Sequence, residues 1–145
     1  MFYYGSEGDC NCLIIELFWN SIEDHFKNLR QEFTLRTILI IAYQMINLIK
    51  RIHSRGILHR DIKPDNFVTQ NQRERYSLAI IDFGLSKSFL TSAGHHIPII
   101  YNKSLTGTTR YASLNNHEGI EQSRRDDIES AFYIWVYLAK GKLPW

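Results

Sequence analysis

Residues 59–66 form a short polar stretch whose side chains are suited to phosphoryl transfer. Asp61 supplies a carboxylate, Lys63 an ammonium group two residues later, and Asn66 a carboxamide five residues after the carboxylate. A carboxylate can accept the proton of an attacking hydroxyl, an ammonium can neutralise charge on the transferring phosphate, and an amide oxygen can hold a hard cation such as Mg²⁺. Asp82 offers a second oxygen ligand for the same cation. These residue types predict a phosphoryl-transfer site that uses magnesium.

The spacing of these residues matches the signature of the protein kinases. In that signature the catalytic loop reads H-R-D-x-x-x-x-N and is followed by D-F-G. Nine residues of this chain fit in order and spacing: His59, Arg60, Asp61, Lys63, Pro64, Asn66, Asp82, Phe83 and Gly84. Either tripeptide alone could be a charged turn or the end of a strand, whereas nine matching identities make coincidence negligible. Lys63 stands where Ser/Thr kinases carry lysine, so the expected acceptor is a Ser or Thr hydroxyl.

A finer resemblance lies in the second half of the chain. The stretches 105–115 and 119–130 resemble the casein kinase I family of Ser/Thr protein kinases. That family carries Ser-Ile-Asn where most kinases have Ala-Pro-Glu, and this chain has Ser113-Leu114-Asn115 at that place. Shorter matching stretches are residues 4–9, 21–24, 44–47, 95–98 and 143–145. The resemblance covers essentially the whole chain.

The resemblance implies a role for each residue of the expected catalytic site. Asp61 would be the catalytic base, and Lys63 would contact the transferring phosphate. Asn66 and Asp82 would hold Mg²⁺, and ATP would be the phosphate donor. Thr108 would bridge Asp61 and Lys63 through its hydroxyl and help to seat the substrate.

The resemblance also implies where the adenine ring of ATP would bind. Glu16 and Phe18 match the hinge segment of the family, whose backbone carbonyl and amide pair with adenine. Ile15, Val68 and Ile81 match the apolar residues above, below and behind the ring. These five residues are the expected nucleotide pocket, next to Asp82 on the phosphate side.

The expected partners are protein substrates with an acidic or phosphorylated residue upstream of the Ser or Thr acceptor. Arg110 matches an anion-binding arginine of the casein kinase I family, and Arg60, Lys87 and Lys103 match a second basic cluster. Converging cations suit phosphate because their hydrogen bonds to it are charge-assisted. The alternative is that Lys87 and Lys103 are solvated loop charges. Asp127 matches a buried aspartate that fixes the catalytic loop through backbone amides.

Helices and strands must position these residues, and apolar periodicity predicts the longest helix, at about residues 35–52. Apolar residues recur there at three- and four-residue spacing: Leu35, Ile38, Leu39, Ala42, Met45, Ile46, Ile49 and Ile52. This pattern predicts a helix of about six turns with one buried face. Thr34 can cap its start and Gly56 can end it. A shorter helix is predicted to begin at Ser21, which forms a capping box with Asp24.

Short strands and one long loop are expected around the catalytic stretch. Apolar runs predict strands at residues 12–18, 57–58, 66–69 and 77–81. Residues 85–109 show no sustained period, which predicts a long ordered loop. Residues 126–139 carry aromatic or aliphatic side chains on most faces, which predicts a buried helix that ends at Gly141.

The expected fold is α+β, mainly α, and of protein kinase type. Residues 1–18 would be the end of the N-lobe with the hinge, and residues 19–145 an incomplete C-lobe. The 145 residues contain neither the G-x-G-x-x-G loop nor the V-A-I-K lysine motif with which kinases hold phosphates. We therefore expect a fragment of a kinase, little phosphoryl transfer by the isolated chain, and exposed apolar surface. The alternative hypothesis is a genuine short product that acts as a noncatalytic interaction protein.

Composition and charge exclude several other classes of protein. A hydrophobic content of 44% with 22% charged residues is typical of a globular domain and not of a disordered chain, a collagen or a coiled coil. Lys and Arg number 17 against 15 Asp and Glu, so the net charge of +2 does not indicate a nucleic-acid partner. The longest apolar run, 131–139, is half the length of a membrane span, and the first residues lack a signal-peptide pattern. We expect a protein of the cytoplasm, the nucleus or both.

Overall fold

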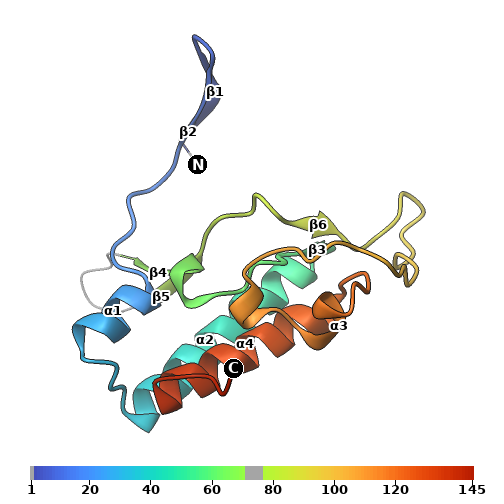
Figure 1. The fold of residues 1–145 in the computed structure, drawn as a ribbon. Coiled ribbons are helices and arrows are strands. Elements are labelled where there is room, and N and C mark those ends of the chain that lie inside the picture. Colours follow the sequence, from blue (N-terminus) through green and yellow to red (C-terminus); the bar gives the residue numbers. More distant parts are fainter. Residues whose placement is uncertain (1, 71–76) are drawn as a thin grey trace.

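Two long helices form the centre of the fold. A computed structural model describes residues 2–70 and 77–145 of the chain. In this structure α2 (Leu35–His53) and α4 (Arg124–Lys140) lie side by side (Figure 1). The apolar core around them includes Phe26, Met45, Ile49, Phe67, Ala131 and Ile134. Because burial of apolar surface is the main favourable term in folding, this helix pair is the base on which the loops of the molecule rest.

Helix α2 confirms the predicted helix in its position and its ends. At its start the Thr34 side chain accepts a hydrogen bond from the Thr37 amide at 3.2 Å. Beyond its last residue the chain turns at Gly56, whose φ of +76° is a conformation that glycine adopts without strain. The cap and the glycine therefore fix where the helix begins and ends, as the sequence indicates.

The buried face of α2 differs in part from the predicted one. Four of the eight predicted core residues are buried, namely Ile38, Met45, Ile49 and Ile52. The prediction is wrong for three others, because Leu35, Leu39 and Ile46 are 70%, 60% and 43% exposed. Ile41, outside the predicted set, is buried instead. Three- and four-residue spacing selects a stripe wider than the single face that the rest of the chain covers.

Helix α4 begins and ends close to the predicted limits but is buried on only one side. Ser123 and Asp126 form a capping box at its start, and Gly141 ends it with a φ of +73°. The expected burial on most faces is wrong, because Phe132 is 55% and Ile128 is 40% exposed. Exposed apolar surface is therefore present on both long helices. Among the described residues, no helix combines the length and apolar character that a membrane crossing requires.

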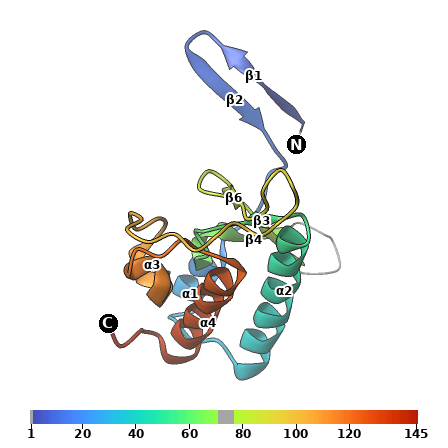
Figure 2. The same ribbon diagram turned by 90° about the vertical axis from the view of Figure 1, so that its right-hand side faces the viewer.

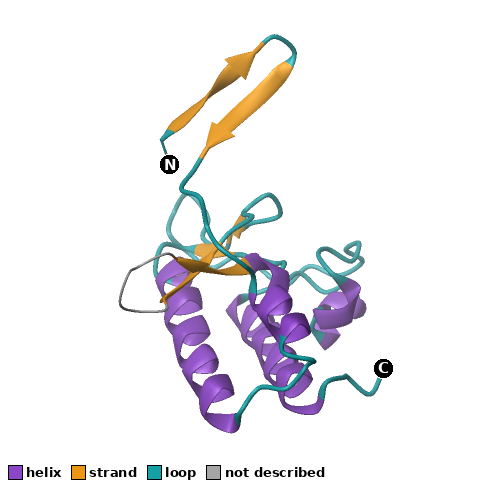
Figure 3. Ribbon diagram, turned by 90° about the vertical axis from the view of Figure 1, so that its left-hand side faces the viewer, coloured by secondary structure: helices purple, strands orange, loops and turns teal. Residues whose placement is uncertain are grey.

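Strands occur as short antiparallel pairs within residues 2–70 and 77–145. The pairs are β1 (Tyr3–Glu7) with β2 (Cys10–Ile14), β3 (Ile57–Leu58) with β6 (Lys87–Ser88), and β4 (Phe67–Gln70) with β5 (Ser77–Ile80). The β1–β2 hairpin projects from the helical body (Figure 2), and Figure 3 shows the other strands lying over one end of the helices. Strands β3, β4 and β5 confirm the prediction. The strand predicted at 12–18 is wrong beyond Ile14, and the apolar pattern does not indicate β1 or β6.

Short helical segments complete a mixed α/β fold that is mainly helical, as expected. Helix α1 (Ile22–Asn28) starts at the predicted capping box, in which Ser21 and Asp24 bond to each other's backbone amides. The remaining segments are η1 (Pro64–Asn66), η2 (Thr109–Tyr111) and α3 (Leu114–His117). The first of these lies within the polar stretch that carries the predicted catalytic residues, and the other two follow the long loop.

Met45 and Leu39 test which face of α2 carries the stability of the fold. Met45 is fully buried, so Met45→Ala should lower the free energy of unfolding by about 2–5 kcal/mol, because the removed side chain leaves a cavity. Leu39→Ala, at a side chain that is 60% exposed, should change it by less than about 0.5 kcal/mol. Chemical denaturation followed by circular dichroism measures both changes. Equal losses in the two variants would contradict the packing of α2.

Candidate active site

The loop that carries Asp61 follows β3, and helix α4 fixes it from below. Asp127 of α4 is 2% exposed, and its carboxylate accepts hydrogen bonds from the backbone amides of His59 and Arg60, each at 2.9 Å. The ring of His53, at the end of α2, contacts the same carboxylate at 2.8 Å. Hydrogen bonds to an ionised acceptor are stronger than those between neutral groups. The structural role that the family resemblance implies for Asp127 is therefore confirmed.

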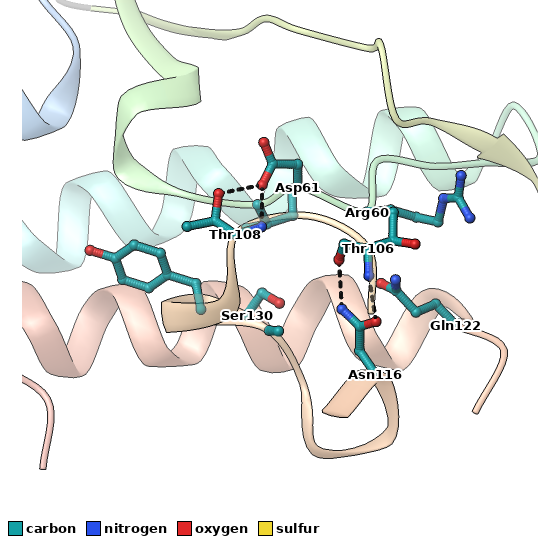
Figure 4. Close-up of a pocket in the computed structure, with 10 residues that line it drawn as sticks. Arg60, Asp61, Thr106, Thr108, Asn116, Gln122 and Ser130 are labelled. Atoms are coloured by element: carbon teal, nitrogen blue, oxygen red, sulfur yellow. Dashed lines mark hydrogen bonds between the residues drawn. The ribbon is translucent and has the colours of Figure 1, made fainter. Parts of the chain in front are cut away.

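Asp61 is held by three neighbouring side chains. Its Oδ1 accepts hydrogen bonds from the Thr108 amide at 2.8 Å and the Thr108 hydroxyl at 2.7 Å (Figure 4). Its Oδ2 lies 2.9 Å from the Lys63 ammonium and accepts a hydrogen bond from Asn66 Nδ2 at 3.3 Å. The fold thus brings together four of the predicted site residues. The bridge differs from the expected one, because Lys63 contacts Asp61 directly while Thr108 holds the other carboxylate oxygen.

These contacts determine the charge state of the two central groups. Burial alone would raise the pKa of Asp61, but the hydrogen bonds from Lys63 and Thr108 outweigh burial and lower the pKa below its ordinary value. The hydrogen bond to Asp61 is the main reason why the pKa of Lys63 is raised. A carboxylate and an ammonium therefore stand side by side at neutral pH. These are the charges that proton acceptance and phosphate neutralisation require.

The turn at residues 106–108 must approach the catalytic loop closely to place its threonine. At its centre Gly107 has a φ of +88°, and a Cβ at this position would overlap the carbonyl oxygen of Arg60. Beside it, Asn116 accepts a hydrogen bond from the Thr106 amide at 3.1 Å and donates one to the Thr106 carbonyl at 2.7 Å (Figure 4). Sequence reasoning missed Asn116, because no motif marks a contact that depends on how two loops meet.

Asn66 and Asp82 are the residues that could hold a cation. The Ile81 amide donates to the Asn66 carbonyl at 3.0 Å, which fixes the residue before Asp82 against the catalytic loop. Asn66 uses its Nδ2 to donate to Asp61, so its Oδ1 can serve as a ligand. Among the described residues, no group of three or more His, Cys, Asp or Glu side chains could hold a metal ion. One carboxylate and one amide oxygen fit Mg²⁺, which takes few protein ligands and completes its shell with water and phosphate oxygens.

The residues expected around adenine lie in two parts of the fold. Val68 on β4 is 5% exposed, and the backbone there forms a β-bridge with Ser21, three residues beyond the predicted hinge. Ile81 and Phe18 are partly buried, whereas Ile15 is 44% exposed. Residues 15–18 run from the projecting hairpin towards the body (Figure 1). The structure therefore places the end of this segment beside β4 and leaves its start open to solvent.

The basic residues expected to bind anions all have partners in the fold. Lys87 and Lys103 contact the same oxygen of Glu121, at 2.8 Å and 3.5 Å. Both lysines are therefore paired with a buried carboxylate, while their side chains stay partly exposed, at 34% and 44%. Arg60 donates through Nε to the backbone of the following loop, and the Arg110 guanidinium lies over the Tyr137 ring at 4.7 Å.

Glu121 is a second residue that sequence reasoning missed. It is 5% exposed and lies between α3 and α4. Burial alone would raise the pKa of Glu121, but the hydrogen bond from Lys87 and the charges of both lysines lower it below its ordinary value. A glutamate in a polar loop carries no sign of burial in its sequence, so only the folded chain identifies it as the partner of the two lysines.

One comparison with known proteins bears on this site. The family model described as Protein kinase domain matches residues 2–145. The match therefore includes the loop with Asp61, the segment with Asp82 and the turn with Thr108. It describes the family as a whole and does not distinguish the subfamilies within it.

The ion pairs of Glu121 predict how stability depends on pH. Because its pKa is lowered in the folded state, the carboxylate stabilises the fold above the ordinary value of 4.5, and this stabilisation is lost as pH falls through the lower folded value. Glu121→Gln should be less stable than the unsubstituted chain near neutral pH and should lose less stability on acidification. Thermal unfolding over a pH series measures this difference. The matched control is Glu118→Gln, at an exposed position, which should keep the original pH dependence; parallel curves for Glu121→Gln and the unsubstituted chain would contradict the prediction.

Proposed function

Because this chain belongs to the protein kinase domain family, we propose that it carries the catalytic residues of a Ser/Thr protein kinase of casein kinase I type. Membership of the family implies protein phosphorylation with ATP as the phosphate donor. The observation that carries the proposal is the environment of Asp61. Its carboxylate is buried, is oriented by the Thr108 amide and hydroxyl, and lies 2.9 Å from the Lys63 ammonium.

In the proposed reaction, a Ser or Thr hydroxyl of the substrate attacks the γ-phosphorus of ATP, the bond from this phosphorus to the β,γ-bridging oxygen breaks, and ADP leaves. Asp61 orients the hydroxyl and accepts its proton. Lys63 uses one N–H on Asp61 and has others with which to neutralise charge on the transferring phosphate. Thr108 keeps the carboxylate in one orientation, so little reorganisation is needed when the hydroxyl arrives.

The proposed nucleotide site combines the hinge, β4 and the Asp82 segment. Glu16 and Phe18 would pair with adenine through their backbone, and Ile15, Val68 and Ile81 would contact the ring. Mg²⁺ held by Asn66 and Asp82 would neutralise charge on the phosphates. The proposal keeps the division of the chain into the end of an N-lobe with the hinge, 1–18, and part of a C-lobe, 19–145.

The proposed substrates carry acidic or phosphorylated residues upstream of the acceptor. Arg110 supports this proposal because its guanidinium lies over the Tyr137 ring, which restrains a cation near the Thr108 turn without neutralising it. Lys87 and Lys103 share one carboxylate, so their pair keeps an excess of positive charge. Arg60, on the catalytic loop, would complete this second cluster.

A noncatalytic role as an interaction protein is the second candidate, and one observation favours it. The outer face of α2 exposes large apolar side chains, with Leu35 at 70%, Leu39 at 60% and Tyr43 at 72%. Exposed apolar patches on helices are common at protein interaction surfaces. This role needs neither an ionised Asp61 nor its contacts with Lys63 and Thr108, so a test of phosphoryl transfer separates the two candidates.

Asp61→Asn tests the proposed catalytic base. This change keeps the size of the side chain but removes the proton acceptor, so the slow phosphate transfer from ATP to a Ser peptide that is expected of this chain should fall by at least about 100-fold. Transfer of radiolabelled phosphate measures the rate, and mass spectrometry identifies the modified hydroxyl. Asp65→Asn is the matched control, since Asp65 is an exposed carboxylate of the same loop. Equal transfer by Asp61→Asn and Asp65→Asn, or no transfer by the unsubstituted chain, would contradict catalysis by this chain.

Arg110→Gln tests the proposed anion preference. Loss of the guanidinium charge should raise KM about tenfold for a peptide with acidic residues upstream of its Ser, and should leave kcat nearly unchanged, because Arg110 does not contact Asp61 or Lys63 in this structure. A peptide with Gln at the acidic positions should show a much smaller change. Arg125→Gln, at a side chain that is 61% exposed, is the matched control for loss of one positive charge. The same rise in KM for both peptides would overturn the assignment of Arg110.

A further inference from the structure

The β1–β2 hairpin places both cysteines of the chain on one face. The chain contains two cysteines, Cys10 and Cys12, and both lie on β2. Alternate residues of a strand point to the same side of a sheet, so the two thiols share one face. Asn11, between them, points the other way, where the Ser6 hydroxyl donates to its Oδ1 at 2.9 Å. The orientation of the pair therefore follows from a contact on the opposite face as well as from the strand itself.

Both thiols are free and reachable from solvent. Cys10 is exposed, Cys12 is partly exposed, and neither forms a disulfide. The hairpin projects away from the helical body (Figure 3), so small ions in solution can reach this face. An accessible thiol that loses its proton is both a nucleophile and a metal ligand. The pair therefore gives the hairpin a chemistry that is separate from the Asp61 site.

The neighbouring strand shields the pair on one side. Gly5 lies directly across from Cys12 in the antiparallel register, and opposite residues of such a pair point to the same side of the sheet. The Tyr3 side chain lies over Gly5, where a Cβ would stand. The ring of Tyr3 therefore limits the access of water to the Cys12 thiol from the side of β1.

The spacing of the pair suits an ion that bridges two sulfur atoms. Two residues apart along a strand, the Cα atoms are separated by about 6.5 Å. This separation is near the upper limit of about 6.8 Å for a disulfide, so the extended strand disfavours a direct bond between the two sulfur atoms. Two metal–sulfur bonds of about 2.3 Å reach further than one S–S bond of about 2.0 Å. A bridging ion therefore fits the strand better than a disulfide does.

The small number of ligands decides which ion fits. In residues 2–70 and 77–145, the two thiols have no third His, Cys, Asp or Glu side chain placed to complete a larger metal site. Structural zinc sites use four protein ligands, and Mg²⁺ and Ca²⁺ take oxygen ligands. Cu(I) is a soft ion that prefers thiolates and is stable with two of them.

We propose that Cys10 and Cys12 form a binding site for one Cu(I) ion. Each thiol releases its proton and donates a sulfur lone pair to the ion, so the bound state is a thiolate–Cu(I)–thiolate bridge with one net negative charge. The site needs only the hairpin, and it does not depend on phosphoryl transfer at Asp61.

Titration of the full, reduced 145-residue chain with Cu(I) tests the site. With oxygen excluded, and in competition with the chromogenic chelator bicinchoninate, the chain should take up one Cu(I) ion without a change in its oligomeric state. X-ray absorption at the copper edge should show two sulfur neighbours. No uptake, a copper-dependent dimer that contributes one thiol from each chain, or copper surrounded by nitrogen and oxygen would overturn the proposal.

Substitutions at the two cysteines test the ligands. Cys10→Ser and Cys12→Ser should each weaken Cu(I) binding by at least about 100-fold, because even groups that only support a ligand contribute about 10- to 100-fold to metal affinity. Tyr4→Phe is the matched control, because Tyr4 lies on the opposite face of the hairpin, across from Leu13. This variant should keep the affinity of the unsubstituted chain.

A variant that keeps two thiols tests the shared face. Cys12→Ser combined with Leu13→Cys moves the second thiol by one residue, to the other side of β2. This variant should bind Cu(I) as weakly as Cys12→Ser alone. Affinity equal to that of the unsubstituted chain, in this variant or in either single serine variant, would refute the site. Each result is obtained without ATP or a peptide, so a failure here differs from a failure of the proposed function.

Discussion

The hydrogen bonds from the His59 and Arg60 amides to the Asp127 carboxylate are the constraint on which the catalytic loop depends. Arg60 has a φ of +66°, in the left-handed region that costs a residue other than glycine about 1–3 kcal/mol. The ionised acceptor at its amide offsets this strain and holds the bend in the loop. The bend sets the direction of Asp61, the next residue. The carbonyl oxygen of Arg60 is the backbone atom that Gly107 approaches. One buried carboxylate thus determines where the loop and the facing turn can meet.

Charge pairing is the second property that organises the molecule. Lys63 is paired with Asp61, and Lys87 and Lys103 are paired with Glu121. A bare buried charge is costly, whereas an ammonium on a carboxylate keeps two of its three N–H groups for another acceptor. Such lysines can contact a phosphate without first losing a full shell of water. The pairs therefore combine stability near neutral pH with the capacity to bind anions.

The catalytic residues could be read from the sequence because their spacing is fixed by a short loop. Asp61, Lys63 and Asn66 come together locally, and Thr108 was assigned through the family resemblance. Asn116 and Glu121 could not be found in this way, because their partners meet them through tertiary contacts that no local pattern records.

The fold shows the same division between local and tertiary signals. Caps such as Thr34 and Gly141 act within a few residues, so the helix ends are predictable from the sequence. Which apolar residues of α2 are buried depends on the helix that packs against it. Leu39 was predicted to be buried but is exposed, whereas Ile41, outside the predicted set, is buried. Strand β6 forms only because β3 lies beside it.

Helix α4 contacts several of the segments that surround Asp61. Asp126 accepts hydrogen bonds from the Ser113 hydroxyl and from the side-chain Nδ2 of Asn115, which fixes the start of α3. Asp127 fixes the catalytic loop, and Ser130 lines a small pocket together with Thr106 and Thr108 (Figure 4). Residues three apart lie on the same side of a helix. Asp127 and Ser130 therefore reach the catalytic loop and the Thr108 turn from one face of α4. Because Ala131 and Ile134 anchor this helix in the core, the geometry around Asp61 is set by the same packing that stabilises the fold.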